Sequence, residues 1–226
     1  MIFAITNHNN LIVQIQCYNL YVAKNKKTNN WLNKHIKDRY VLESKKMNFS
    51  SRAAFKLLSI DKKFQILNKV KYVVDLGCAP GSWCEVLNKK PNIKNIIGID
   101  KLPCGPIKNV EIHQIDINDY SKIKEVMSKY NYKFDLVLSD IAPNITGVTT
   151  IDQENFMVVA ESILEFCKVY LNYGGKMAMK FFNGYKLSEL KDSLTDVFDE
   201  VSIYKPDSSR QKSREVYLVC VDYRHQ

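Results

Sequence analysis

The sequence lacks the patterns that mark several common protein classes. None of its six cysteines forms a Cys-x-x-Cys pair, and its four histidines do not cluster near them, so we expect no metal site. No apolar run approaches the roughly 18 residues that a membrane span needs. The cysteines lie scattered at positions 17, 78, 84, 104, 167 and 220. We expect them to be reduced and buried, in a protein of an intracellular compartment.

Residues 1–29 contain no acidic residue and no arginine, and they are rich in apolar residues and asparagine. They are interpreted either as a disordered extension or as an organelle-targeting segment, although the Arg- and Ser-rich character of a typical transit peptide is missing. The compartment, cytoplasmic or organellar (for example mitochondrial), therefore stays open. Residues 30–226 are long enough for a single domain, and 46% of the chain is hydrophobic.

Positive charge is concentrated at the front of this domain. The chain carries a net charge of +9, and residues 24–63 hold 12 Lys and Arg against three acids. A basic segment with aromatic residues indicates an anionic partner, of which nucleic acid is the commonest. The alternative is a compositional bias that only produces a solvated face. If the partner is nucleic acid, basic helices over about residues 30–69 are expected to hold it.

Buried apolar runs alternate with amphipathic segments along most of the chain. Strands are predicted around Val73–Asp75 and at 95–100, 110–116, 134–140, 176–182, 201–204 and 216–223. Helices are predicted at 31–40, 119–130, 152–171 and 187–198, with another that starts at Ser50 or Ser51 and has an apolar face of Ala53, Leu57, Ile60 and Phe64. This alternation predicts an α/β fold with a doubly wound, mostly parallel seven-stranded sheet whose last strand is antiparallel.

The stretch KYVVDLGCAPGSW, residues 71–83, indicates a strand, a glycine-rich turn and a helix start at which Ser82 can be the cap. Such a turn lets a nucleotide-like ligand approach the backbone, although many turns of this kind bind nothing. The cofactor-binding candidates here are Asp75, Gly77, Pro80 and Gly81. Asp100 follows Asp75 by 25 residues, close to the spacing of an acid that binds the ribose of an adenosine cofactor. The G-x-G-x-x-G register of NAD sites is absent, and Asp75 is expected to meet the cationic amino end of S-adenosylmethionine.

Carboxylates follow four of the predicted strands, at Asp75, Asp100, Asp116 and Asp140. In a parallel sheet these ends share one edge, so they are expected to line a cleft, although each could instead cap a helix. Lys180 lies inside the apolar run MAMKFF, where an unpaired charge is costly. It either snorkels toward water or pairs with a carboxylate, for which Asp140 and Glu215 are the candidates.

Seven motifs together resemble the FtsJ/RrmJ family of S-adenosylmethionine-dependent RNA 2′-O-ribose methyltransferases. They are WLNKHIKDRY, SSRAAFKLLSID, VVDLGCAPGSW, the IGID strand end, LVLSDIAPNITG, GGKMAMKFF and KPDSSRQKSREVYLV, in that order from Trp31 nearly to the C-terminus. The resemblance implies a Rossmann-like methyltransferase fold, S-adenosylmethionine as the cofactor and S-adenosylhomocysteine as its product. It implies a catalytic group of Lys56, Asp140, Lys180 and Glu215, and cofactor contacts by Gly81, Trp83, Asp100, Asp116 and Asp140.

Within the family, the SREVY motif is more similar to the ribosomal-RNA branch than to the tRNA branch. The implied substrate is a uridine ribose of large-subunit ribosomal RNA, within the subunit, for a monomeric enzyme. A base-carbon methyltransferase would need a cysteine nucleophile, and the one Pro-Cys pair, Pro103-Cys104, follows the wrong strand. The turn after the fourth strand, Asp140-Ile-Ala-Pro143, also differs from the Asn/Asp-Pro-Pro-aromatic turn of amine methyltransferases. A tRNA ribose methyltransferase stays the alternative.

In the implied reaction Lys180 either accepts the proton of the 2′-hydroxyl or mainly positions that hydroxyl. Asp140 is expected to orient Lys180 and the cofactor methyl group, while Lys56 and Glu215 fix the substrate ribose. Rival interpretations are a non-catalytic RNA-binding assembly factor and an NAD-dependent oxidoreductase. The residues expected to contact RNA phosphates are Lys34, Lys37, Arg39, Lys45, Lys46, Arg52, Arg210 and Arg214.

Overall fold

The computed structural model describes residues 38–224 of the chain. The chain divides into two compact units, residues 1–42 and 43–226. The predicted boundary at residue 29, the predicted helix at 31–37 and the candidates Lys34 and Lys37 lie outside the described residues. Helix α3, Arg39–Lys46, crosses from the first unit into the second and carries Lys45 and Lys46 exposed in its last turn.

The second unit is built on one seven-stranded sheet with the strand order β3-β2-β1-β4-β5-β7-β6. The strands are β1 Tyr72–Leu76, β2 Asn95–Asp100, β3 Glu111–Gln114, β4 Phe134–Ser139, β5 Leu171–Phe182, β6 Phe198–Tyr204 and β7 Glu215–Tyr223. The first five strands in this order pair in parallel, and β7 runs antiparallel to both β5 and β6. The predicted doubly wound, mostly parallel sheet with an antiparallel last strand is confirmed.

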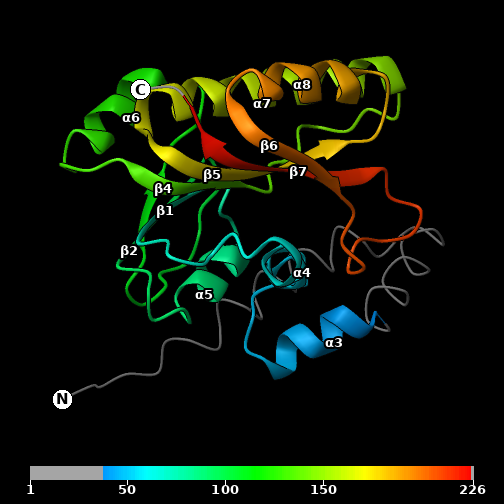
Figure 1. Cartoon of the computed structure of the whole chain (residues 1–226). Helices are drawn as coiled ribbons and strands as arrows, with labels where there is room; N and C mark the ends of the chain where they lie inside the picture. The colour runs from blue at the N-terminus through cyan, green and yellow to red at the C-terminus, as the bar shows by residue number, and fades with distance from the viewer. Residues whose placement is uncertain (1–37, 225–226) are drawn as a thin grey trace. The chain divides into compact units, whose positions relative to one another are not determined.

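Helices pack on both faces of this sheet. The helices of this unit are α4 Ala54–Phe64, α5 Ser82–Leu87, α6 Tyr120–Met127, α7 Thr149–Tyr170 and α8 Lys186–Thr195. Figure 1 shows α6, α7 and α8 on one side of the sheet and α4 and α5 on the other. Each side has its own buried cluster, one containing Phe156 and Leu190, the other Leu57 and Trp83. Central strands are buried on both sides, which explains their continuous apolar runs.

Both predicted serine caps are wrong. Helix α4 begins at Ala54 without a side-chain cap, because Ser50 Oγ donates to Glu85 and Ser51 Oγ accepts from the Ala53 amide at 3.1 Å. In α5 the cap position belongs to Gly81, and Ser82 is the first helical residue. The Ser82 hydroxyl lies 2.7 Å from that of Ser51. These serines therefore connect two segments instead of capping the N-termini of helices.

Two strands begin earlier than predicted. Strand β5 starts at Leu171, and a bulge separates its pairings with Phe134 and Leu136, so the Asn172–Gly175 stretch belongs to the strand. Strand β6 starts at Phe198, which the sequence places in a helix. Phe198 is fully buried against Tyr223 of β7, and this tertiary contact overrides the helical spacing.

Candidate active site

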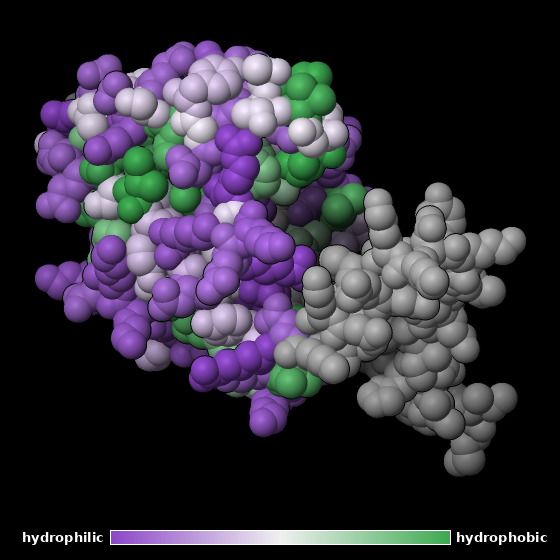
Figure 2. Space-filling model, turned by 90° about the vertical axis from the view of Figure 1, so that its right-hand side faces the viewer, coloured by the Kyte–Doolittle hydropathy of each residue, from purple (hydrophilic) through white to green (hydrophobic). Residues whose placement is uncertain are grey.

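A cavity of about 540 Å³ lies at the carboxyl ends of the parallel strands. Four of the predicted cofactor residues line it, namely Gly77, Asp100, Asp116 and Asp140. The rest of its wall is largely apolar, and α7 closes one side with Val158 and Val159. Figure 2 shows this end of the sheet, where hydrophilic residues dominate and separate hydrophobic patches lie among them. The cavity thus combines apolar walls with a few carboxylates, as small-molecule sites do.

Two of the carboxylates that line the cavity, those of Asp100 and Asp116, are held in place by hydrogen bonds. Asp100 ends β2 and accepts from the amides of Ala79 at 2.9 Å and Leu102 at 2.8 Å. Asp116 accepts from the amide and the side-chain amide of Asn118, at 2.9 Å and 3.0 Å. Asp116 keeps Oδ2 without a bond among these contacts, and each oxygen of Asp100 accepts only one, so both side chains remain able to bind ligand hydroxyl or amino groups.

The other predicted cofactor residues, Asp75, Pro80, Gly81 and Trp83, do not line the cavity. Trp83 is 2% exposed and its indole N–H donates to the Ala53 carbonyl at 2.8 Å. Gly81 takes φ of 108° at the start of α5, and Pro80 is exposed. Asp75 is 1% exposed and accepts from Cys84 Sγ at 3.4 Å. Burial raises the pKa of Asp75 to about 7. Its expected contact with the amino end of a cofactor stays a prediction.

Lys180 and Asp140 form a pair beside the cavity. Lys180 lies on β5, is 8% exposed, and donates to Asp140 Oδ1 at 3.0 Å and to the Asp140 carbonyl. Asp140 follows β4, the neighbouring strand, so the two side chains meet at the carboxyl edge. The buried lysine is therefore paired and does not snorkel. Asp140 also lines the cavity, so it belongs to both places.

A second pair extends this cluster. Lys56 Nζ, on α4, lies 2.8 Å from Glu215 Oε2 and 3.6 Å from Asp140 Oδ2. The other oxygen of Glu215, at the start of β7, accepts from Ser209 Oγ at 2.7 Å. The structure thus brings together all four predicted catalytic residues as two lysines alternating with two carboxylates. Glu215 contacts Lys56 and not Lys180, although the sequence left both pairings open.

Tyr217 completes the cluster, and sequence reasoning missed it. Its hydroxyl donates to Asp140 Oδ1 at 2.6 Å, and Lys56 Nζ lies 5.7 Å from its ring centroid. The signal was available, because Tyr217 lies two residues after Glu215 on β7 and therefore on the same face of that strand. In the sheet it pairs with Lys180.

Charge determines the state of Asp140. Burial alone would raise the pKa of Asp140, but the positive charges of Lys180 and then Lys56, together with the Tyr217 hydroxyl, hold it below its ordinary value. The Tyr217 hydroxyl stays protonated, because burial first, and then the charges of Asp140 and Glu215, raise its pKa well above the usual range. Asp140 is therefore a carboxylate that accepts from Lys180 and Tyr217 and forms an ion pair with Lys56.

The predicted RNA-contact residues of the second unit fall into two groups. Lys45, Lys46 and Arg210 are exposed. Arg52 is partly buried and donates to the Ser208 carbonyl, and burial followed by the charge of Arg210 lowers its pKa. Arg214 donates to the Asn183 carbonyl and to Thr149 Oγ1, so its guanidinium fastens the loop after β5 to the start of α7. Arg39, exposed, belongs to the first unit.

The described cysteines, Cys78, Cys84, Cys104, Cys167 and Cys220, form no disulfide, and all but Cys104, which is partly exposed, are buried as predicted. Among residues 38–224, no group of His, Cys, Asp or Glu side chains is arranged to hold a metal ion. The same part of the chain contains no helix that is long and apolar enough to cross a membrane.

The comparisons with known proteins all find similarity to methyltransferases. Residues 49–223 match the family described as FtsJ-like methyltransferase. A ribosomal RNA large subunit methyltransferase E of Wolbachia sp. is 39% identical over 84% of this chain and 86% of its own length. Its namesake from Azoarcus sp. is 36% identical over 90% of this chain and all of its own length. A crystal structure described as a ribosomal RNA methyltransferase of Plasmodium falciparum aligns with a TM-score of 0.68 at 37% identity, covering 79% of this chain and all of the other.

Proposed function

This chain belongs to the FtsJ-like methyltransferase family, and on that basis we propose that it methylates a ribose 2′-hydroxyl of large-subunit ribosomal RNA, with S-adenosylmethionine as the methyl donor. The observation that carries the proposal is the double position of Asp140, which lines the cavity and bonds Lys180. A cofactor in the cavity and an acceptor group at Lys180 would meet at this carboxylate. The names of the relatives support ribosomal RNA as the substrate, and a uridine is the expected nucleotide.

The cavity residues fit the proposed cofactor. Its volume of about 540 Å³ falls in the range of roughly 300–1,000 Å³ that small-molecule sites occupy. Asp100 would accept from ribose hydroxyls and Asp116 from the adenine amino group, while Ile99 and Ile115 provide apolar wall. When bound there, S-adenosylmethionine supplies the electrophilic methyl group of its sulfonium centre.

The catalytic cluster then acts on the acceptor hydroxyl. Lys180, an ammonium group paired with Asp140, positions the 2′-hydroxyl. It accepts the hydroxyl proton as a neutral amine, after its own proton has passed to solvent, while the oxygen attacks the methyl group. Asp140 fixes the direction of the Lys180 side chain through the bonds to its carboxylate and carbonyl oxygens. Lys56 and Glu215, which contact each other at 2.8 Å, lie beside this pair and position the ribose.

Positive charge beside the cluster suits a phosphate. Arg210 lowers the pKa of Arg52, which means that the two guanidinium groups repel each other. A phosphate between them would relieve this repulsion and anchor the nucleotide whose ribose reaches Lys180. Lys45 and Lys46 provide further exposed charge for the RNA backbone.

The test is transfer of labelled methyl groups from S-adenosylmethionine to large ribosomal subunits, free ribosomal RNA and tRNA, with the product mapped by resistance to alkaline cleavage. Label on a ribose of large-subunit RNA is expected. Lys180→Ala should lower turnover by about 10²–10⁴-fold, the usual contribution of a positioned proton acceptor, while cofactor affinity persists. Lys168→Ala is the matched control, because Lys168 is an exposed lysine on α7 paired with Glu165.

Other outcomes would change the assignment. Label in tRNA alone would keep the chemistry and contradict the substrate. Cofactor binding without label in any RNA would favour a non-catalytic assembly factor. Unchanged turnover in Lys180→Ala would remove Lys180 from the mechanism.

A further inference from the structure

A row of lysines lies at the opposite edge of the sheet from the catalytic cluster. Lys94 directly precedes β2, Lys71 directly precedes β1, and Lys133 directly precedes β4, and these three strands are neighbours. The amides of Lys94 and Asn95 donate to the Lys71 carbonyl at 2.8 Å and 3.1 Å. Neighbouring strands lie about 4.8 Å apart, so the three side chains start from adjacent points of one edge.

These lysines carry charge that the protein does not neutralise. Lys71, Lys94 and Lys133, with Lys69 before them, are exposed. Within residues 38–224, none of their four ammonium groups forms a hydrogen bond or an ion pair. We call these four residues the amino-edge lysine row.

The carboxylates near the row are already engaged. Asp135 accepts from the amides of Lys71 and Tyr72 at 2.8 Å and 3.0 Å, and from the Asn172 side chain at 2.9 Å. Asp61 pairs with Lys90 at 2.6 Å. The four lysines of the row outnumber the acids Asp135 and Glu111 that line the adjacent hollows, so positive charge is in excess on this edge.

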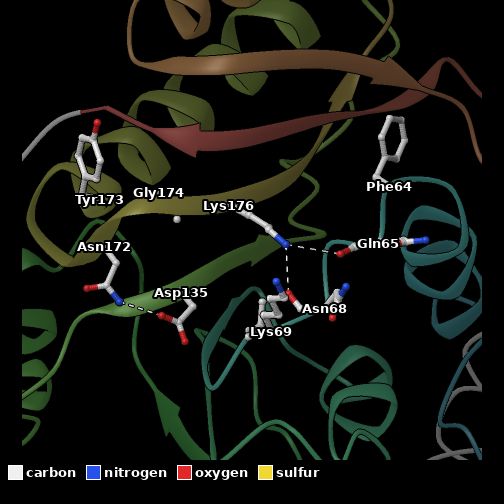
Figure 3. Close-up of a pocket in the computed structure, with 11 residues that line it drawn as sticks. Phe64, Gln65, Asn68, Lys69, Asp135, Asn172, Tyr173, Gly174 and Lys176 are labelled. Carbon is white, nitrogen blue, oxygen red and sulfur yellow. Dashed lines mark hydrogen bonds between the residues drawn. The ribbon is translucent and has the colours of Figure 1, made fainter.

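Two hollows border the row: Lys69 lines one of them and Lys94 lines the other. One, of about 410 Å³, is lined by Lys69, Asn68 and Lys176, and it is drawn in Figure 3. There Lys176 donates to the carbonyls of Gln65 and Asn68, at 3.5 Å and 3.2 Å, and Tyr173 presents a ring that is 69% exposed. Burial lowers the pKa of Lys176, so a bound anion would be favourable there.

The second hollow, of about 670 Å³, is lined by Lys90 and Lys94 together with asparagine side chains and one acid, Glu111. Ammonium groups, amide donors and an exposed aromatic ring are what an RNA backbone with its riboses uses. A lipid surface would instead need apolar side chains beside the charges.

We propose that the amino-edge lysine row binds the sugar–phosphate backbone of RNA. The inference rests on the proposed function to the extent that the substrate is RNA, and it adds a second contact face. Strands β1 and β2 have five and six residues, which at about 3.3 Å per residue separate the two edges by roughly 15–20 Å. A large folded RNA reaches both edges, whereas a short oligonucleotide at the catalytic cluster reaches one.

The test compares two triple variants of the full chain. The first is Lys71→Gln, Lys94→Gln and Lys133→Gln, and the second is Lys122→Gln, Lys186→Gln and Lys191→Gln. The second set removes the same charge from α6 and α8, where Lys122 and Lys186 are ion-paired. Binding to deproteinised large-subunit ribosomal RNA and to a short single-stranded oligonucleotide is measured over a range of salt concentrations, and thermal unfolding is recorded for both variants.

The edge variant should bind the large RNA about tenfold more weakly, and its slope of log affinity against log salt should fall by about 2 to 3, because each phosphate contact contributes about 0.7 to 0.9. Its affinity for the oligonucleotide and for S-adenosylmethionine should stay unchanged. Equal slopes in the two variants at equal thermal stability would overturn the proposal. Binding of anionic phospholipid vesicles through the row, without an effect on RNA, would overturn it too.

The result is independent of methyl transfer. Loss of RNA affinity in the edge variant supports the second face even if the wild-type protein labels no RNA, which would contradict the proposed function alone.

Discussion

Tyr217 is a residue whose hydroxyl contacts the charged cluster proposed to be catalytic. It donates to Asp140 at 2.6 Å, and its ring packs against Trp83 with centroids 5.9 Å apart. Trp83 lies on α5, the helix that follows the turn after β1. Tyr217 therefore contacts both Asp140 and the helix that follows this turn. Its hydroxyl and its ring have separable roles, because a phenylalanine keeps only the ring.

Tyr217→Phe should lower turnover by about tenfold, since one hydrogen bond to a charged group contributes about 1.5–3 kcal/mol and Lys180 still holds Asp140. The hydroxyl helps to lower the pKa of Asp140, so its loss raises that pKa. A carboxylate with a higher pKa becomes protonated at higher pH. The acid limb of the turnover–pH profile should therefore move to higher pH.

The measurement is a pH profile of turnover for the variant and the wild type, with cofactor affinity determined in parallel. Tyr204→Phe is the matched control, because Tyr204 is the partner of Tyr217 on the neighbouring strand β6, and its hydroxyl contacts Ser59 Oγ on α4 at 2.7 Å in place of Asp140. An acid limb that does not move would show that Tyr217 does not tune Asp140.

Among single residues, the sequence identified a site residue when its side chain was chemically unusual for its position in a strand. Lys180 stands out because it interrupts an apolar strand, and its pairing with Asp140 is confirmed. Tyr217 does not stand out, because a tyrosine in a buried strand fits an ordinary core. The bond of Ser209 to Glu215 was equally invisible, since it depends on how the loop before β7 folds back.

Among the elements, the turn between β1 and α5 carries the strictest backbone requirement. Gly77 has φ of 81°, and a Cβ there would lie 2.2 Å from the Ile141 side chain, which also lines the cavity. A side chain at position 77 would thus meet both backbone strain and a clash.

Gly77→Ala should destabilise the protein by about 1–3 kcal/mol, which corresponds to a fall in Tm of roughly 2–12 °C for a chain of this size. Thermal unfolding measures this. Gly105→Ala should leave Tm unchanged, because nothing lies within 4 Å of its added Cβ. Gly147→Ala, with φ of 84° and open space, isolates the backbone strain from the clash. If Gly77→Ala matched Gly105→Ala, the requirement at the turn would be refuted.

The elements were predictable where burial alone determines them. The runs at 95–100 and 134–139 are short and apolar, and they form β2 and β4 as the sequence indicates. The ends of α4, α5 and β5 were not predictable, because they depend on partners distant in sequence. Ser50 bonds Glu85, 35 residues away, in place of capping its own helix.

On the scale of the whole molecule, the site draws on segments that lie far apart in the chain. Lys56 and Glu215 are separated by 159 residues and yet lie in contact. Strand alternation predicts a parallel sheet with its ligands at the carboxyl edge, and the cavity is found there. The order in which β7 inserts between β5 and β6 has no local signal, because it follows from the packing of the finished sheet.

The same arrangement predicts which cofactor the protein binds. S-adenosylmethionine at 100 times its Kd should stabilise the fold by about 2.7 kcal/mol and raise Tm by roughly 5–11 °C. NAD should not, because the turn after β1 lacks the G-x-G-x-x-G register that cradles a pyrophosphate, and the cavity is lined by three carboxylates that repel one. Thermal unfolding with each ligand decides between them. Asp116→Ala should weaken the shift by S-adenosylmethionine, because it removes the carboxylate proposed to accept from the adenine amino group. Stabilisation by NAD in preference to S-adenosylmethionine would contradict the assignment of the cavity while leaving the fold untouched.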